Sequence, residues 1–328
     1  MNVFYFTSDL FASVAATSIV SLLENNKAVK EINFYIVDDG ITSENKEKLT
    51  AMITSYGRYV HYIVAPDPSE LFDFPFKSRY QMGHSYVRMA IATLLPETVE
   101  RVIALDSDTL VVGNLFELWK LDMGENILAG VADCMNLDAY SRKFGLSGEE
   151  FYCNAGVFLI DLKKWREQKI EKKIKNVIRE KNGNVFFFEQ TLMNYSCKGK
   201  ICKLHPKYNC YTLFFAFDYK NLIRWRKPTI FYTEAEVSEA KAKPIIIHFT
   251  RNFYMLSRPW VKGCDHPMSA QYKKYKELTA WPNLDEDNRT WKQLTKYRLW
   301  HLFPQNIIAR GASVLYNLVR PRIWWKNE

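Results

Sequence analysis

Short apolar runs alternate along this chain with segments whose apolar residues recur at helical spacing. The apolar runs, each predicted to form a strand, are Val3–Phe6, Ile32–Val37, Val102–Leu105, Ile127–Ala132, Val157–Ile160 and Ile245–Ile247. The predicted helices are Leu10–Asn25, Ser43–Tyr56, Ser85–Leu95 and Lys163–Lys181. Strands that alternate with helices are typical of βαβ units, so the sequence predicts an α/β fold with a largely parallel sheet.

Polar side chains directly follow most of the predicted strands. These polar segments begin at Thr7, Asp38, Asp106, Asp133 and His248. In an open α/β sheet, ligands bind at the carboxyl ends of the strands. We therefore expect the five segments, although far apart in the sequence, to border one crevice.

Asp106 and Asp108 are the main candidates for a metal site. Two aspartates at positions i and i+2 after a strand can face one ligand together and hold a divalent cation through carboxylate oxygens. The spacing alone carries little weight, because two other acidic pairs in the chain share it, but only this pair lies between two apolar runs. There, a charge is costly without a partner. Together with His248, the pair suits Mn²⁺ or Mg²⁺ and a phosphate-bearing ligand.

Composition and charge place the chain among globular proteins and set its last segment apart. Hydrophobic residues make up 48% of the 328 residues, which excludes a disordered, collagen-like or coiled-coil chain. Of a net charge of +9, most lies in residues 289–328, which hold eight basic residues, one acidic residue and four tryptophans. This composition favours contact with an anionic membrane surface. A helix packed on the preceding domain is the alternative, and no motif indicates nucleic-acid binding.

We expect three parts along the chain: a catalytic domain over 1–265, a linker over 266–288 and the basic, tryptophan-rich extension over 289–328. No apolar window is long enough for a transmembrane helix, and the six cysteines form no CxxC pair, which is typical of reduced thiols. The expected location is therefore cytoplasmic, peripheral on the cytoplasmic face of the membrane. The sequence leaves the oligomeric state open.

Over residues 1–265 the sequence resembles the retaining glycosyltransferases of family 8, which include bacterial lipopolysaccharide galactosyl- and glucosyltransferases and glycogenin. The segments that carry the resemblance are Phe6–Phe11, Ser85–Met89, Arg101–Asp108, Gly130–Asp133, Tyr152–Trp165, Glu189–Gln190, His248–Thr250 and Arg258–Trp260. The resemblance implies a GT-A type fold: a single Rossmann-like nucleotide-sugar-binding domain with a mixed, mostly parallel sheet, here followed by a basic, aromatic, helical extension.

The resemblance also implies roles for individual residues. The metal ligands would be Asp106, Asp108 and His248, which would hold Mn²⁺ (or Mg²⁺). Donor-binding residues, for a UDP-sugar, would be Thr7, Ser8, Phe11, Arg88, Ser107, Thr250 and Arg258. Asp133 and Asn154 would contact sugar hydroxyls, and Glu189 and Gln190 would lie beneath the anomeric carbon. Arg258 stands where the family carries lysine, and Arg251 is a second candidate for binding the diphosphate.

The implied activity is the metal-dependent, retaining transfer of galactose or glucose from a UDP-sugar to a glycan or glycolipid acceptor, in lipopolysaccharide or surface-glycan synthesis. Two other interpretations stay open. A sugar-phosphate nucleotidylyltransferase could share the fold, although the chain lacks a glycine-rich, basic N-terminal loop for a triphosphate. A non-catalytic glycan-binding protein at the membrane surface is the other.

Overall fold

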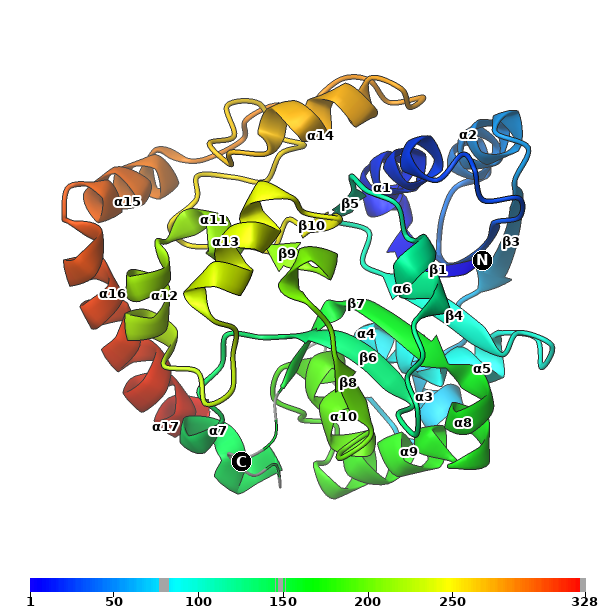
Figure 1. Ribbon diagram of the computed structural model, residues 1–328, viewed down its shortest axis with the longest axis horizontal. Helices are drawn as coiled ribbons and strands as arrows, with labels where there is room; N and C mark the ends of the chain where they lie inside the picture. The colour runs from blue at the N-terminus through cyan, green and yellow to red at the C-terminus, as the bar shows by residue number, and fades with distance from the viewer. Residues whose placement is uncertain (77–82, 145, 147–149, 151, 325–328) are drawn as a thin grey trace.

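Figure 1 shows the protein as a computed structural model that describes residues 1–76, 83–144, 146, 150 and 152–324. A seven-stranded sheet forms its centre. In spatial order the strands are β3 (Tyr59–Val64), β2 (Asn33–Asp39), β1 (Asn2–Ser8), β4 (Arg101–Leu105), β7 (Cys153–Asp161), β6 (Leu128–Ala132) and β8 (Ile201–Lys203). Neighbouring strands pair in parallel except at β7, which runs antiparallel to β4 and β6. The predicted α/β fold with a mixed, mostly parallel sheet is confirmed.

A smaller, three-stranded sheet lies next to the end of β4. It consists of β5 (Thr109–Val111), β10 (Ile246–His248) and β9 (Cys210–Tyr211), with β10 in the middle. β5 follows β4 after a short turn and pairs antiparallel with β10, so that Thr109 lies opposite His248. This pairing brings the end of β10 beside the end of β4.

Helices cover both faces of the large sheet (Figure 1). In the first two hundred residues they are α1 (Ala12–Asn25), α2 (Ser43–Ser55), α3 (Pro68–Phe72), α4 (Gly83–Val87), α5 (Ile91–Leu94), α6 (Phe116–Lys120), α7 (Leu137–Phe144), α8 (Leu162–Glu167), α9 (Ile170–Glu180) and α10 (Phe188–Ser196). Three short helices, α11 (Thr212–Ala216), α12 (Tyr219–Arg226) and α13 (Glu234–Ala242), flank the small sheet.

Alternate residues of the central strands point into two separate hydrophobic cores. Val3 and Tyr5 of β1 pack with α1 and α2 on one face, whereas Phe4 packs with α8, α9 and α10 on the other. Successive side chains of a strand face opposite sides of a sheet. A continuous apolar run such as Val3–Phe6 is therefore the pattern of a strand buried on both faces.

Two of the predicted helices are interrupted, which corrects the sequence-based prediction. The helix predicted over Lys163–Lys181 breaks at Lys169, whose φ of 52° is left-handed, and forms α8 and α9. Trp165 and Ile170 are both buried in the same core. Five positions apart on one continuous helix they would point about 140° away from each other, so the break lets both side chains face the core.

The helix predicted over Ser85–Leu95 divides in the same way. A 3₁₀ turn, η3 (Arg88–Ala90), separates α4 from α5. The buried Arg88 at the start of this turn contacts Asp106 at the end of β4. The helix predicted from Leu10 likewise opens with a 3₁₀ turn, η1 (Asp9–Phe11), before α1. The spacing of apolar residues predicts where such helices lie, but it does not predict a short 3₁₀ turn within or before them.

The strand β3 was not predicted from the sequence. It lies at the edge of the sheet beside β2, and its residues are partly or fully exposed, so no continuous apolar run marks it. Edge strands need no apolar face on the solvent side. The six strands that the sequence predicted are all present, and their ends differ from the prediction by at most four residues.

The last part of the chain is helical. It comprises α14 (Ser269–Lys276), α15 (Trp291–His301), α16 (Gln305–Val314), the π-helical turn η5 (Leu315–Val319) and α17 (Arg320–Trp324). Figure 1 shows α15, α16 and α17 as an arc along one side of the molecule. α16 packs on α12 and buries Ile308, Ala309 and Ala312, and Asn317 donates a hydrogen bond to the Trp225 carbonyl at 2.9 Å. One face of the extension therefore lies against the preceding part of the chain.

Trp325 and Lys326, which the sequence assigns to the extension, lie outside the described residues. Within the described residues, no helix has the length and apolar character needed to cross a bilayer.

Because His266 is buried, we expect the protein to be less stable in acid. The ring contacts Phe215 and Phe249, its Nδ1 accepts the Met268 N–H at 3.1 Å, and burial lowers its pKa from 6.5 to about 4. Between these two values the unfolded chain binds a proton that the folded protein does not. We therefore expect the free energy of unfolding to fall, by up to about 3 kcal/mol, as pH decreases from 6.5 to 4.

The measurement is urea unfolding at several pH values for the wild type and for His266→Asn, whose side-chain oxygen can still accept a hydrogen bond. In the variant, the free energy of unfolding should depend less steeply on pH, because unfolding would take up as much as one proton fewer. Equal slopes for the two proteins would contradict this origin of the acid sensitivity.

Candidate metal and sugar-nucleotide site

The turn between β4 and β5 holds Asp106 and Asp108 in place through its backbone. The Asp106 N–H donates to the Gly156 carbonyl at 2.9 Å, and the Asp106 carbonyl accepts the Thr109 N–H at 3.1 Å. The Asp108 carbonyl accepts the Phe249 N–H at 2.9 Å. Hydrogen bonds within the turn and to two other segments thus fix the backbone that carries both carboxylates.

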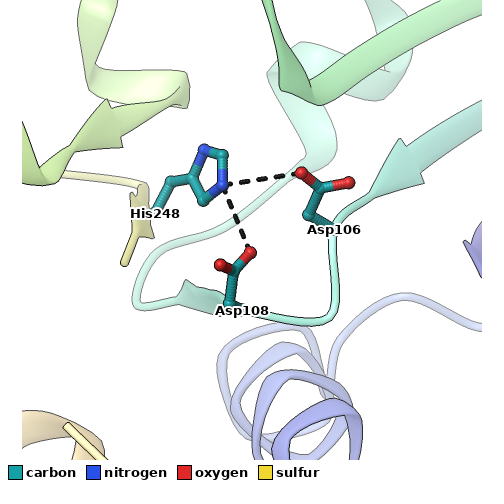
Figure 2. Close-up of side chains that lie close together, drawn as sticks. All are labelled: Asp106, Asp108 and His248. Carbon is teal, nitrogen blue, oxygen red and sulfur yellow. Dashed lines mark ion pairs between the residues drawn. The ribbon is translucent and has the colours of Figure 1, made fainter. Parts of the chain in front are cut away.

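His248 meets both carboxylates from the small sheet (Figure 2). Its Nε2 lies 3.5 Å from Asp106 Oδ2 and 3.2 Å from Asp108 Oδ1. The ring is buried, and its Nδ1 lies 3.1 Å from Asn209 Oδ1. Because an amide oxygen only accepts, Nδ1 carries the hydrogen and Nε2 keeps a lone pair in the neutral ring.

These three side chains suit a divalent cation. One ligand atom from each lies within 4.8 Å of the other two. Carboxylate oxygens with one imidazole nitrogen suit Mn²⁺ or Mg²⁺ better than the thiolate-rich or multi-histidine sets typical of zinc. The hydrogen bond from the far side of the His248 ring is the kind of support that metal-binding histidines usually have. The donor set therefore fits the metal that the resemblance implies.

Gly156 makes room for the His248 ring. A Cβ atom at position 156 would lie 2.1 Å from His248 Cε1 and 2.2 Å from Nδ1, far inside van der Waals contact. Only glycine allows the β7 backbone to approach the ring so closely.

Two arginines pair with the carboxylates. Arg88, buried, forms an ion pair with Asp106, and Arg258 Nη1 lies 3.0 Å from Asp108 Oδ2. Burial alone would raise the pKa of Asp108, but the positive charges of His248 and Arg258 outweigh it and lower that pKa. Burial likewise opposes the charged form of His248, yet Asp108 and Asp106 raise its pKa. Asp108 is therefore held as a carboxylate.

A second group of polar residues lies next to the metal ligands. Gln190 Nε2 donates to Asp133 Oδ2 at 2.9 Å, and Gln190 Oε1 accepts the Ala155 N–H at 3.1 Å. Asn154 Oδ1 accepts the Gly156 N–H at 3.0 Å and a hydrogen from Asn209 at 2.9 Å. The residues proposed for sugar contacts thus form one network, anchored on the first residues of β7.

Glu189, the neighbour of Gln190 in α10, differs in character. Burial raises the pKa of this carboxyl to about 7, although the nearby Arg88 works in the opposite direction. A carboxyl with a pKa near neutrality can take up or release a proton at working pH.

Three of the residues predicted to bind the donor line a cavity of about 720 Å³. Phe11, Thr250 and Arg258 all border it, and the Phe11 ring meets Trp260 edge to face at 6.2 Å. Thr7 and Ser8 end β1, and Ser107 donates a hydrogen bond to the Phe6 carbonyl at 3.2 Å, but none of these three residues borders the cavity. A second cavity, of about 620 Å³, is bordered by Asp133 and Asn154, and Thr250 lies on both.

Two residues of the site escaped the sequence-based prediction. Asn209 connects His248 to Asn154, and Arg226 of α12 lies 3.5 Å from Asp133 Oδ1. Neither belongs to a segment that follows one of the predicted strands. An asparagine shortly before β9 and an arginine in an amphipathic helix are ordinary features of a surface, so the sequence offered no signal for either.

A mixed α/β sheet with two aspartates and a histidine at its carboxyl edge defines the class of GT-A type glycosyltransferases. The sequence pattern of "Glycosyl transferase family 8" matches residues 2–262. The chain belongs to glycosyltransferase family 8, and the prediction that it is a hexosyltransferase of this family is confirmed.

The chain is also similar to individual proteins. The chain is similar to "General stress protein A" of Bacillus subtilis (25% identical over 284 residues, 86% of this chain and 94% of the relative). It is similar to a lipopolysaccharide 1,2-glucosyltransferase of Escherichia coli K12 (27% identical over 327 residues, 96% of this chain and 90% of the relative). The galactosyltransferase LgtC, solved with donor and acceptor sugar analogs, has the same fold (TM-score 0.68, 23% identical, 90% of this chain and 100% of that one).

Proposed function

We propose that the protein is a metal-dependent, retaining glycosyltransferase that moves galactose or glucose from a UDP-sugar to a glycan or glycolipid acceptor. The observation that carries the proposal is the meeting of Asp106, Asp108 and His248 from two sheets, with a ligand atom of each within 4.8 Å of the others. In this proposal the three residues hold Mn²⁺ or Mg²⁺. A cation bound by these residues would act as a Lewis acid and neutralise charge on the departing diphosphate.

The arginines and Phe11 position the donor. Phe11 and Arg258 border the same cavity, so one ligand can stack its base on the ring and place its diphosphate near the guanidinium. Arg88, already buried beside Asp106, can reach the junction of sugar and phosphate once Asp106 engages a cation. These residues work by orientation and electrostatic stabilisation rather than by covalent chemistry.

The network around Gln190 lies where the hexose would sit. Asp133 and Asn154 can bind sugar hydroxyls, and the neutral amide of Gln190 can stabilise positive charge at the anomeric carbon. In the overall transfer, the bond from the anomeric carbon to the phosphate oxygen breaks, the acceptor oxygen becomes bonded to that carbon, and the hydroxyl proton passes to the departing diphosphate. Retention requires either a carboxylate nucleophile, for which Glu189 is the candidate, or attack from the leaving-group side.

Stereochemistry tests this proposal directly. We expect an α-linked UDP-galactose or UDP-glucose to give an α-linked product, because each of the two routes keeps the anomeric configuration. Proton NMR of the first-formed product measures the coupling of the anomeric hydrogen. A β-linked first product would exclude a retaining mechanism.

We further propose that the extension holds the enzyme on the cytoplasmic face of an anionic membrane. The helices of the extension carry exposed apolar side chains, here called the apolar ridge: Trp291, Leu299, Leu302, Phe303, Ile307, Val314 and Leu318. Lys292, Lys296, Arg298 and Arg310 are exposed on the same helices. Apolar side chains flanked by basic ones suit the interface of an anionic bilayer.

Removing the two adjacent ridge residues at the end of α15 should weaken membrane binding. Leu302 is 72% exposed and Phe303 53% exposed, so Leu302→Ser/Phe303→Ser leaves the core unchanged. Binding to vesicles that contain phosphatidylglycerol should fall at least about tenfold, because each buried apolar side chain contributes roughly 1.5 kcal/mol or more.

The matched control is Val64→Ser, at a 77% exposed position of the edge strand β3 far along the chain from the ridge. Vesicle co-sedimentation at two salt concentrations provides the measurement, with stronger binding at low salt for the wild type. Equal binding by the double variant and the control would rule out the ridge as the membrane contact.

A further inference from the structure

The cavity of about 620 Å³ lies between the catalytic region and the helices of the extension. Asp133 and Asn154 form part of its wall on the catalytic side. Trp300 of α15, Tyr316 of η5 and Arg320 of α17 border it from the extension. Figure 1 shows α16 beside α12, so the helices of the extension close a space that the catalytic region alone would leave open.

The position of this cavity assigns it to the acceptor side, an argument that rests on the proposed function. Phe11 and Arg258, proposed to bind the nucleoside and the diphosphate, border the other cavity. Asp133 and Asn154, proposed to contact the hexose, border this one. A sugar held between the two groups would present its anomeric carbon toward the space under the extension.

The walls of the cavity suit a saccharide ring. Trp225, Phe253, Trp300 and Tyr316 are among its lining residues, and Trp225 and Trp300 both contact Phe253 at ring-centroid distances of 5.1 Å. Binding sites for small molecules combine such aromatic surface with a few polar groups that fix orientation. The apolar face of a sugar ring can pack on these side chains.

More arginines than carboxylates border the cavity. Arg226 lies beside Asp133, but Arg320 has no ion-pair partner in the part of the chain that the structure describes. The Arg320 guanidinium instead lies over the rings of Phe187, at 4.8 Å, and Tyr316, at 5.6 Å. Arg251, on the border of both cavities, likewise lacks a carboxylate partner among the described residues. An arginine held against aromatic surface keeps its donors free for a bidentate anion.

We infer that this cavity binds an acceptor saccharide that carries an anionic group, a phosphate or a carboxylate, and that Arg320 binds that group. The saccharide packs on the aromatic walls with its nucleophilic hydroxyl toward Asp133. The anionic group points to the extension. The extension is then part of the acceptor site, besides any contact it makes with a membrane.

Matched saccharides test the inference. Isothermal titration calorimetry compares glucose with glucose 6-phosphate, galactose with galacturonate, and a glucosyl diphosphate linked to a short isoprenoid with its uncharged alkyl glucoside. UDP and Mn²⁺ are present throughout, so that the donor-phosphate site is occupied. We expect the wild type to bind the anionic member of at least one pair ten times more tightly or better. The pair that shows the preference identifies the source of the anion.

Three variants locate the anion site. Arg320→Gln should reduce the preference to less than threefold, and Arg320→Lys should keep part of it because the charge remains. Arg310→Gln, an exposed arginine of α16 that does not border the cavity, should keep the full preference. An undiminished preference in Arg320→Gln would overturn the inference.

The outcomes also separate this inference from the proposed function. Mn²⁺-dependent binding of UDP without any preference for an anionic saccharide overturns the inference and leaves the proposed function intact. Failure to bind UDP, with a preference that still depends on Arg320, overturns the proposed function and supports the anion site.

Discussion

Asp108→Ala should abolish metal-dependent transfer and lower turnover by about two orders of magnitude or more. Asp108 is the carboxylate that meets both His248, at 3.2 Å, and Arg258, at 3.0 Å. Its loss removes one charged metal ligand and leaves Arg258 without its partner. Asp106→Ala should behave in the same way, and His248→Ala more mildly, because water can replace a neutral ligand. Transfer from a UDP-sugar, measured across a range of Mn²⁺ concentrations, checks the expectation.

The chain contains its own control for this substitution. Glu234 and Glu236 have the same i, i+2 spacing, but Glu234 is exposed in the first turn of α13 and borders neither of the two cavities. Glu234→Ala should therefore leave turnover and its metal dependence unchanged. A variant at position 108 that keeps more than a tenth of the wild-type rate, with an intact fold, would argue against the metal site.

Gly156→Ala should displace His248 and disable the site without touching any ligand. The added methyl group would lie 2.1 Å from the His248 ring, and the ring cannot retreat without losing its contact with Asn209. Such overpacking costs about 1–3 kcal/mol of stability. We expect weaker Mn²⁺ binding, at least tenfold, together with a lower melting temperature. Calorimetric titration with Mn²⁺ and thermal unfolding measure the two effects.

Gly311→Ala is the matched control for this second prediction. Nothing lies within 4 Å of a Cβ at position 311, and the residue sits inside α16. Alanine is favoured over glycine in a helix by roughly 0.5–1 kcal/mol, so this variant should be slightly more stable and bind Mn²⁺ normally. If Gly156→Ala bound Mn²⁺ as tightly as Gly311→Ala does, close packing at position 156 would not be what positions His248.

The sequence predicted those parts of the site that follow from strand ends. Asp106, Asp133 and His248 each come directly after or at the end of an apolar run, and the sheet brings the ends of such runs together. Asn209 and Arg226 could not be found in this way, because each acts through one specific contact across the fold. A contact between distant segments leaves no pattern in the local sequence. The end of a strand does, because an apolar run stops there.

The extension illustrates the same limit. Its basic, aromatic composition indicated a surface for membranes, and its packing on α12 was one of two alternatives that composition could not separate. Trp300 and Arg320 border a cavity with Asp133 only because α15 and α17 fold back along one side of the molecule. A pattern of charges and rings along a helix does not specify the partner that its inner face meets.

The pairing of Thr109 with His248 joins strands about 140 positions apart in the sequence. During synthesis, the two aspartates leave the ribosome long before the histidine that completes their site. Contacts that close so long a loop tend to form late in folding. A ligand stabilises only the state that binds it, by about 2.7 kcal/mol at a hundredfold excess over its dissociation constant. Mn²⁺ should thus stabilise the finished chain against cellular proteases, whereas a prematurely terminated chain that lacks β10 would gain no such protection.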